Sequence, residues 1–194
     1  MRLTLGKIGW GVVGTVLLIT PLWASASNQE VKPENSLAYN WGYAEEASEL
    51  LQEIRGLSTQ LTDDTDYLEQ SARRNQLNWR SHAVRLDEIR TDINAMGEYL
   101  QRLQEIHSMI APWQQKAVDR IVPKAVALAE HTEAAIAYLN DNKNRMWTPS
   151  YGDPVSAMAE QAEAIRYNVN MFLDYGNASD RLMGLEDQLE TSGA

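Results

Sequence analysis

Apolar residues recur every three or four positions along four long stretches of the chain, which is the spacing of helices with one apolar face. These stretches run from Leu37 to Ala72, from Trp79 to Ile110, from Trp113 to Leu139 and from Val155 to Leu189. No strand-length segment alternates apolar with polar residues. The pattern therefore predicts an all-α protein.

Turn-forming residues between the stretches indicate where the helices begin and end. Asn78 is a suitable N-cap, and Pro112 suits the first turn of a helix because its missing N–H costs nothing there. Residues 140–152 are rich in Asn, Pro and Gly, and the pair Asp153-Pro154 then opens the last helix. The predicted helices span about 36–73, 78–110, 112–146 and 153–190, after a linker at 27–35 and before a tail at 191–194.

Four amphipathic helices of similar length with short connections favour an elongated antiparallel up-down-up-down four-helix bundle. Counting from the turns puts Gly56, Gly97, Ala125 and Gly176 at one height in this bundle. Glycine inside a helix costs about 1 kcal/mol relative to alanine, so a shared layer of small residues calls for a reason. The layer predicts either a narrow waist, which we favour because core voids destabilise, or a cavity for a small apolar ligand.

The first 26 residues have the three parts of a secretory signal peptide. Arg2 and Lys7 form the basic region, residues 8–23 form the apolar region, and Ala24-Ser25-Ala26 supplies small residues for cleavage. The apolar run is shorter than the roughly 20 residues that span a bilayer. We expect cleavage after Ala26 and a periplasmic or secreted protein. The alternative is an inner-membrane anchor formed by residues 8–26.

Composition narrows the possible partners and chemistry. The chain has no cysteine, so disulfides and thiolate sites are excluded. Its formal net charge of −10 makes nucleic acid an unfavourable partner, and we expect none. Membrane contact is expected only if the N-terminal segment is retained.

The three histidines do not form a metal site in the predicted bundle. Helix geometry separates His82, His107 and His131 by at least about 13 Å along the axis. Each is expected to be satisfied by one neighbour, and Asp92 lies level with His131. No helix carries the Glu-x-x-His motif of di-iron bundles, and no nucleophile or phosphate-binding motif is present. We therefore expect no metal, no cofactor and no enzymatic activity.

One end of the predicted bundle collects cations and aromatic side chains, because its first and third turns meet there. Arg and Trp are enriched in binding hot spots, so this end is a candidate partner-binding surface. The competing interpretation is that the arginines complement helix dipoles while the tryptophans cover the core. The residues are Arg73, Arg74, Trp79, Arg80, His82, Lys143, Arg145, Trp147 and Tyr151.

Several segments resemble a family of exported helical proteins of Acidobacteria-type soil bacteria. The resemblance is carried by Asn78-Trp79-Arg80-Ser81-His82-Ala83, by Met96-Gly97, by residues 112–121 and by residues 131–136. It implies export and a helical fold, and it carries over no activity and no functional residues.

The sequence thus predicts an exported, non-enzymatic helical bundle that is structural or binds a macromolecule of the cell envelope. The partner would be an envelope protein or polymer, and a homo-oligomer is possible. The alternative is a sensory or carrier bundle holding a small apolar ligand near the layer of Gly56, Gly97 and Gly176.

Overall fold

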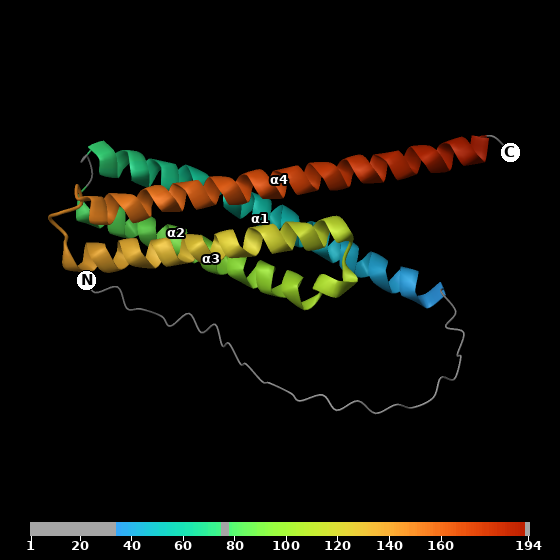
Figure 1. Cartoon of the computed structure of the whole chain (residues 1–194), viewed down its shortest axis with the longest axis horizontal. Helices are drawn as coiled ribbons and strands as arrows, with labels where there is room; N and C mark the ends of the chain where they lie inside the picture. The colour runs from blue at the N-terminus through green and yellow to red at the C-terminus, as the bar shows by residue number, and fades with distance from the viewer. Residues whose placement is uncertain (1–33, 75–77, 193–194) are drawn as a thin grey trace, which may run out of the picture.

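A computed structural model of the chain describes residues 34–74 and 78–192, which form four long α-helices (Figure 1). The helices are α1 (Glu34–Arg74), α2 (Trp79–Glu105), α3 (Pro112–Asp141) and α4 (Pro149–Ser192), with a short 3-10 helix, η1 (His107–Met109), between α2 and α3. The predicted signal peptide and most of the predicted linker lie outside the described residues. None of the described helices is both long enough and apolar enough to cross a membrane.

Each helix packs against the next, and α4 returns to pack against α1. This closed set of neighbours is an up-down four-helix bundle, so the predicted fold class is confirmed (Figure 1). Aliphatic side chains from all four helices fill the interior. Leu51, Leu86, Ile121 and Val155, one from each helix, are completely buried. All four belong to the apolar stripes of the sequence.

The helices differ in length, whereas the sequence predicts four of similar length. α1 and α4 have 41 and 44 residues, but α2 and α3 have 27 and 30. α2 ends at Glu105, five residues before its predicted end, and the chain continues through η1. The two long helices consequently extend past the short pair and diverge at the end away from the α3–α4 loop (Figure 1).

The α3–α4 loop is placed earlier in the chain than the sequence predicts. α3 ends at Asp141 and α4 begins at Pro149, rather than at about 146 and 153. The backbone N–H groups of Tyr151 and Gly152 both donate to the carbonyl oxygen of Thr148 at 3.0 Å, which starts the helix there. Pro149 thus takes the favourable first position. Pro154, the predicted start, lies inside α4.

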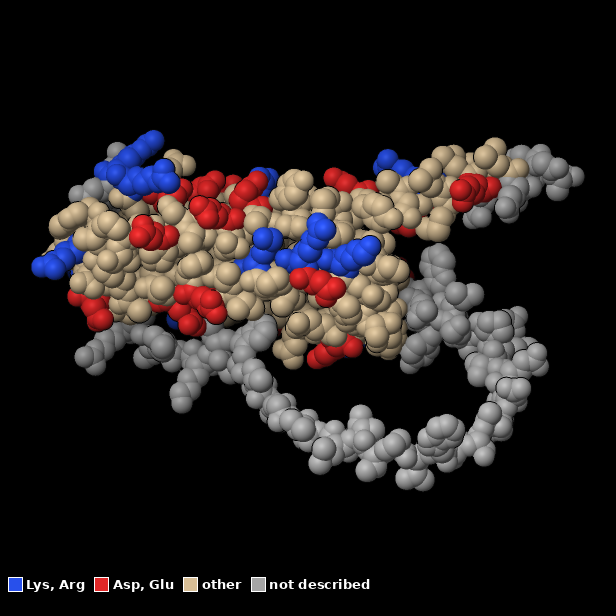
Figure 2. Space-filling view, in the orientation of Figure 1, with Lys and Arg blue, Asp and Glu red and all other residues tan. Residues whose placement is uncertain are grey.

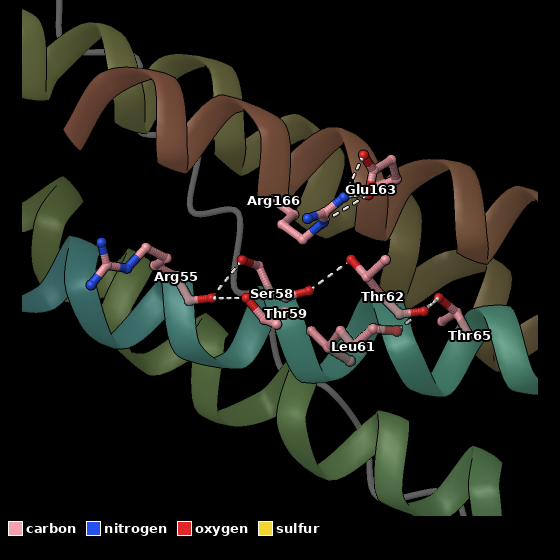
Figure 3. A network of polar contacts seen from close by, with 8 residues as sticks. All are labelled: Arg55, Ser58, Thr59, Leu61, Thr62, Thr65, Glu163 and Arg166. Atoms are coloured by element: carbon pink, nitrogen blue, oxygen red, sulfur yellow. Dashed lines mark hydrogen bonds and ion pairs between the residues drawn. The ribbon is translucent and has the colours of Figure 1, made fainter. Parts of the chain in front are cut away.

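A row of buried hydroxyl groups on α1 does not belong to the predicted apolar stripe. Ser58, Thr62 and Thr65 are buried, and each donates to a carbonyl oxygen three or four residues earlier at 2.7–2.8 Å (Figure 3). These bonds satisfy the hydroxyls inside their own helix, so burying them leaves no donor unpaired. Glu163 and Arg166 of α4 form an ion pair near this row (Figure 3).

Gln114 ties the start of α3 to α1. Its side chain is 1% exposed, and its Nε2 donates to the carbonyl oxygen of Ala44 at 2.7 Å and to the Ser48 hydroxyl at 2.9 Å. Its Oε1 accepts a hydrogen bond from the backbone N–H of Ala111 at 2.9 Å. One buried amide thereby fixes both the α3 N-terminus and its height against α1.

Candidate functional site

The α1–α2 turn and the α3–α4 loop lie at the same end of the bundle, as the turn positions predict. The contacts of the Trp79 ring show this directly, because Arg80 Cζ lies 5.0 Å and Lys143 Nζ lies 4.5 Å from the ring centroid. Lys143 belongs to the α3–α4 loop, whereas Trp79 and Arg80 open α2. We call this region the basic-aromatic end. It comprises Arg73, Arg74, Trp79, Arg80, His82, Lys143, Arg145, Trp147 and Tyr151.

Local hydrogen bonds fix the start of α2 within this end. The Asn78 side chain accepts hydrogen bonds from the backbone N–H groups of Arg80 and Ser81, at 3.0 and 3.1 Å. The predicted N-cap is therefore confirmed. Since the cap sets the backbone of the first turn, it also fixes the positions from which the Trp79 and Arg80 side chains project.

Hydrogen bonds to the α3–α4 loop keep Trp147 in an exposed position. The Tyr138 hydroxyl donates to the carbonyl oxygen of Arg145 at 3.2 Å and lies 2.5 Å from the Thr148 hydroxyl oxygen. Met146 points into the core and is 9% exposed, whereas its neighbour Trp147 is 63% exposed. These hydrogen bonds anchor the loop on both sides of Trp147. They therefore fix the loop conformation in which Trp147 is exposed.

His82 and Tyr151 cannot contact a partner, which corrects their assignment to the binding surface. Their side chains are 1% and 0% exposed, and His82 Nδ1 lies 2.8 Å from the Tyr151 hydroxyl oxygen. Burial lowers the pKa of His82 and raises the pKa of Tyr151, so both are neutral near pH 7. The pair links α2 to α4 beneath the exposed residues and supports this end from inside.

The cations of this end have few acidic partners. Arg73 pairs with Glu69 at 2.7 Å, but Arg74, Arg80, Lys143 and Arg145 form no ion pair with any described residue. The space-filling view shows cations at this end, on the left, and acidic groups along the neighbouring faces (Figure 2). A second group of cations crosses the middle of the same view. The basic-aromatic end is therefore a local positive region on an acidic protein.

A shallow pocket of about 380 Å³ adjoins this end between α1 and α2, and the sequence did not indicate it. Its lining includes Tyr67, Arg80 and Arg85. Arg85 lies 5.3 Å from the Tyr67 ring centroid and forms ion pairs with Asp64 at 2.6 Å and with Glu88 at 3.1 Å. Arg85 is thus neutralised by its own neighbours, and the positive charge beside the pocket comes from Arg80.

The other histidines have separate surroundings. His107 pairs with Asp119 at 3.0 Å, so the expectation of one partner is met there, as it is for His82. Asp92, which lies level with His131 in the predicted bundle, does not pair with it, because no hydrogen bond between described residues joins them and Asp92 Oδ2 is buried without a partner. Burial, followed by the charges of Asp64 and Glu88, raises the pKa of Asp92. Within the described residues, no three His, Asp or Glu side chains are placed to hold a metal ion.

The small-residue layer does not form as predicted. A Cβ added to Gly56 or Gly97 would meet no atom within 4 Å, and Gly56 is exposed. Gly176 is buried beside Trp113, at the start of α3, rather than beside Ala125. The reason is the early α3–α4 loop, which shifts α4 along α3. No narrow waist is therefore built at Gly56 and Gly97, and Gly56, being exposed, lines no enclosed ligand site.

These features define the class of protein as a four-helix bundle with a basic and aromatic end. Comparisons with protein-family models, curated proteins and solved structures found no match. The resemblance to exported Acidobacteria-type proteins therefore stays a prediction.

Proposed function

We propose that this protein is an exported, non-enzymatic helical bundle that binds an acidic macromolecule of the cell envelope through its basic-aromatic end. The observation that carries the proposal is Trp147, which is 63% exposed on a tethered loop. It lies at the end where Arg74, Arg80, Lys143 and Arg145 have no acidic partner among the described residues. Export is inferred from residues 1–26 of the sequence.

The chemistry of this end suits binding for two reasons. An exposed tryptophan offers a large apolar face with few rotatable bonds, so ordering it costs little on association. Arginine adds bidentate hydrogen bonding to carboxylates and stacks on aromatic rings. Trp and Arg together are the side chains most enriched in binding hot spots.

The charge pattern selects an acidic partner. With a net charge of −10, the chain repels polyanions over most of its surface. The basic-aromatic end is one of two places where cations gather in Figure 2, and it also carries the exposed Trp147, so we expect an acidic partner to be steered toward it. This contribution to association should weaken as salt increases.

The proposal is tested by retention of the purified exported protein on immobilised poly-glutamate and on heparin at increasing salt. We expect Arg74→Glu with Arg145→Glu to remove retention, and Trp147→Ala to weaken it. Lys116→Glu with Lys124→Glu is the matched control, because it makes the same change in net charge on α3. All variants should keep the wild-type melting temperature.

Equal loss of retention in the control pair would mean that net charge, rather than this end, controls binding. Retention unchanged in the Arg74/Arg145 variant would refute the proposal. Mild crosslinking in the intact envelope, with and without the same substitutions, then identifies the partner as a protein or a polymer.

A further inference from the structure

The last third of α4 extends beyond the bundle and exposes large apolar side chains. Leu182, Leu185 and Leu189 are 62%, 56% and 74% exposed. Figure 1 shows this part of α4 without another described helix beside it. Single exposed leucines are ordinary, but several on one helix face indicate a surface made for contact.

The spacing of these side chains matches a coiled-coil seam. Tyr175, Ala178, Leu182, Leu185 and Leu189 are separated by three, four, three and four residues. This alternation is the a and d pattern of a heptad repeat, in which apolar residues face a partner helix. Tyr175 is 60% exposed and begins the row. We call these five residues the α4 seam.

We propose that the α4 seam forms a parallel two-stranded coiled coil with a second copy of this chain. The charges beside the seam select this occupant. Arg181 takes position g and Glu186 takes position e of the following heptad. In a parallel coil these two positions face each other across the interface, so Arg181 of each copy meets Glu186 of the other.

Neither charge is matched within its own helix. No acidic residue lies three or four positions from Arg181, and no basic residue lies three or four positions from Glu186. Neither forms an ion pair with another described residue. In an antiparallel coil, g faces g and e faces e, so Arg181 and Glu186 would not meet. The complementarity therefore favours the parallel arrangement.

The projecting part of α4 would also gain packing from a second copy. Helices in proteins are stabilised mainly by the packing of an apolar face, and Gly184 lowers the intrinsic helix stability of this segment relative to alanine. A seam of little more than two heptads buries less surface than a standard interface. We therefore expect a reversible dimer whose population rises with protein concentration.

Disulfide crosslinking is the first test, because the chain has no cysteine of its own to compete with an introduced thiol. Leu182→Cys and Leu185→Cys place thiols at equivalent seam positions of the two copies, within the Cα–Cα reach of a disulfide, roughly 4.4–6.8 Å. Asp180→Cys, on the outer face of the same helix, is the matched control. We expect the two seam variants of the purified exported protein to form covalent dimers under mild oxidation while the control stays monomeric.

A charge exchange is the second test. Arg181→Glu alone should weaken dimerisation about fivefold in sedimentation equilibrium, because two exposed pairs are lost at roughly 0.5 kcal/mol each. Arg181→Glu combined with Glu186→Arg should restore it. The melting temperature of the bundle reports folding, since both residues are exposed.

Equal crosslinking at Asp180→Cys, or a monomer up to millimolar concentration, would overturn the proposal. So would crosslinking of an Ala178→Cys copy with a Leu189→Cys copy in preference to Leu185→Cys with itself, because that pattern is antiparallel. A monomer whose seam is covered by residues of its own chain would also overturn it. These outcomes do not involve the basic-aromatic end, so they are independent of the proposed function.

Discussion

The glycine at position 176 provides a test of the packing, because Gly176→Ala should lack the stability gain expected for Gly56→Ala, or should destabilise the bundle. Both glycines lie inside long helices, where alanine is favoured by about 1 kcal/mol. At Gly56 an added Cβ meets nothing within 4 Å, so the full gain should appear. At Gly176 it would lie 2.6 Å from Cζ2 and 2.8 Å from Cη2 of Trp113.

Carbon atoms pack best at about 3.5–4.0 Å, so Trp113 would have to move by roughly 1 Å. Overpacking of this kind costs about 1–3 kcal/mol, which cancels or exceeds the gain in helix propensity. We expect Gly176→Ala to be less stable than Gly56→Ala by about 1–3 kcal/mol, or about 2–12 °C in Tm for a domain of this size.

Thermal unfolding followed by circular dichroism measures both variants, and adding Trp113→Leu to Gly176→Ala should relieve the clash. The reasoning fails if Gly176→Ala raises Tm as much as Gly56→Ala does, because the indole would then not be packed on the glycine. It also fails if the effects of Gly176→Ala and Trp113→Leu on stability are additive, since substitutions of contacting residues should be coupled.

Two other contacts give predictions for stability. Tyr151→Phe leaves His82 Nδ1 buried without its partner and should lower Tm by about 2–10 °C, measured by calorimetry. Burial lowers the folded-state pKa of His82, so the unfolded chain takes the proton first and stability should fall as pH drops below about 6.5. His82→Asn should flatten this slope in denaturant titrations, and an unchanged slope would assign the acid sensitivity to other groups. Gln114→Ala removes the ties to Ala44 and Ser48 and should lower the unfolding free energy by about 1–3 kcal/mol in urea, whereas a cost near zero would mean that water replaces the amide.

The fold could be predicted from the sequence because long helices with one apolar face have few ways to bury it. Leu51 and Ile121 lie on predicted stripes and are fully buried. Asn78 caps α2 as expected, because its side-chain oxygen is within reach of the N–H groups of the next turn in any such helix. These features are local or periodic, so one sequence is sufficient to indicate them.

The α3–α4 loop could not be predicted because two prolines compete to start α4. Pro149 and Pro154 both satisfy the local rule for a helix start. The structure uses Pro149, which places Tyr151 in the helix and against His82 of α2. That contact joins residues 69 positions apart, and no local pattern reveals it. The resulting shift along α3 is what displaced Gly176 from its predicted level.

The candidate site was predicted only in part, because the turn positions indicate which residues lie at this end but not which way their side chains face. Cations and tryptophans were assigned to one end from the positions of the turns, and the Lys143–Trp79 contact shows that the turns meet. Whether an aromatic residue faces inward depends on helix rotation, which the sequence leaves open for residues near a turn. His82 and Tyr151 therefore proved to be core residues, whereas Trp147 is exposed.

The unusual length of α4 has a consequence for avidity. One continuous helix of 44 residues, about 66 Å long, begins at the basic-aromatic end and finishes at the α4 seam. Two copies joined in parallel at their seams would point both basic-aromatic ends toward the same side. A partner with repeated acidic sites would then bind the second end as an intramolecular step, with an effective concentration set by this rigid spacing. Weak individual contacts could in this way give lasting attachment to a polymeric partner, while a partner with a single site would dissociate quickly.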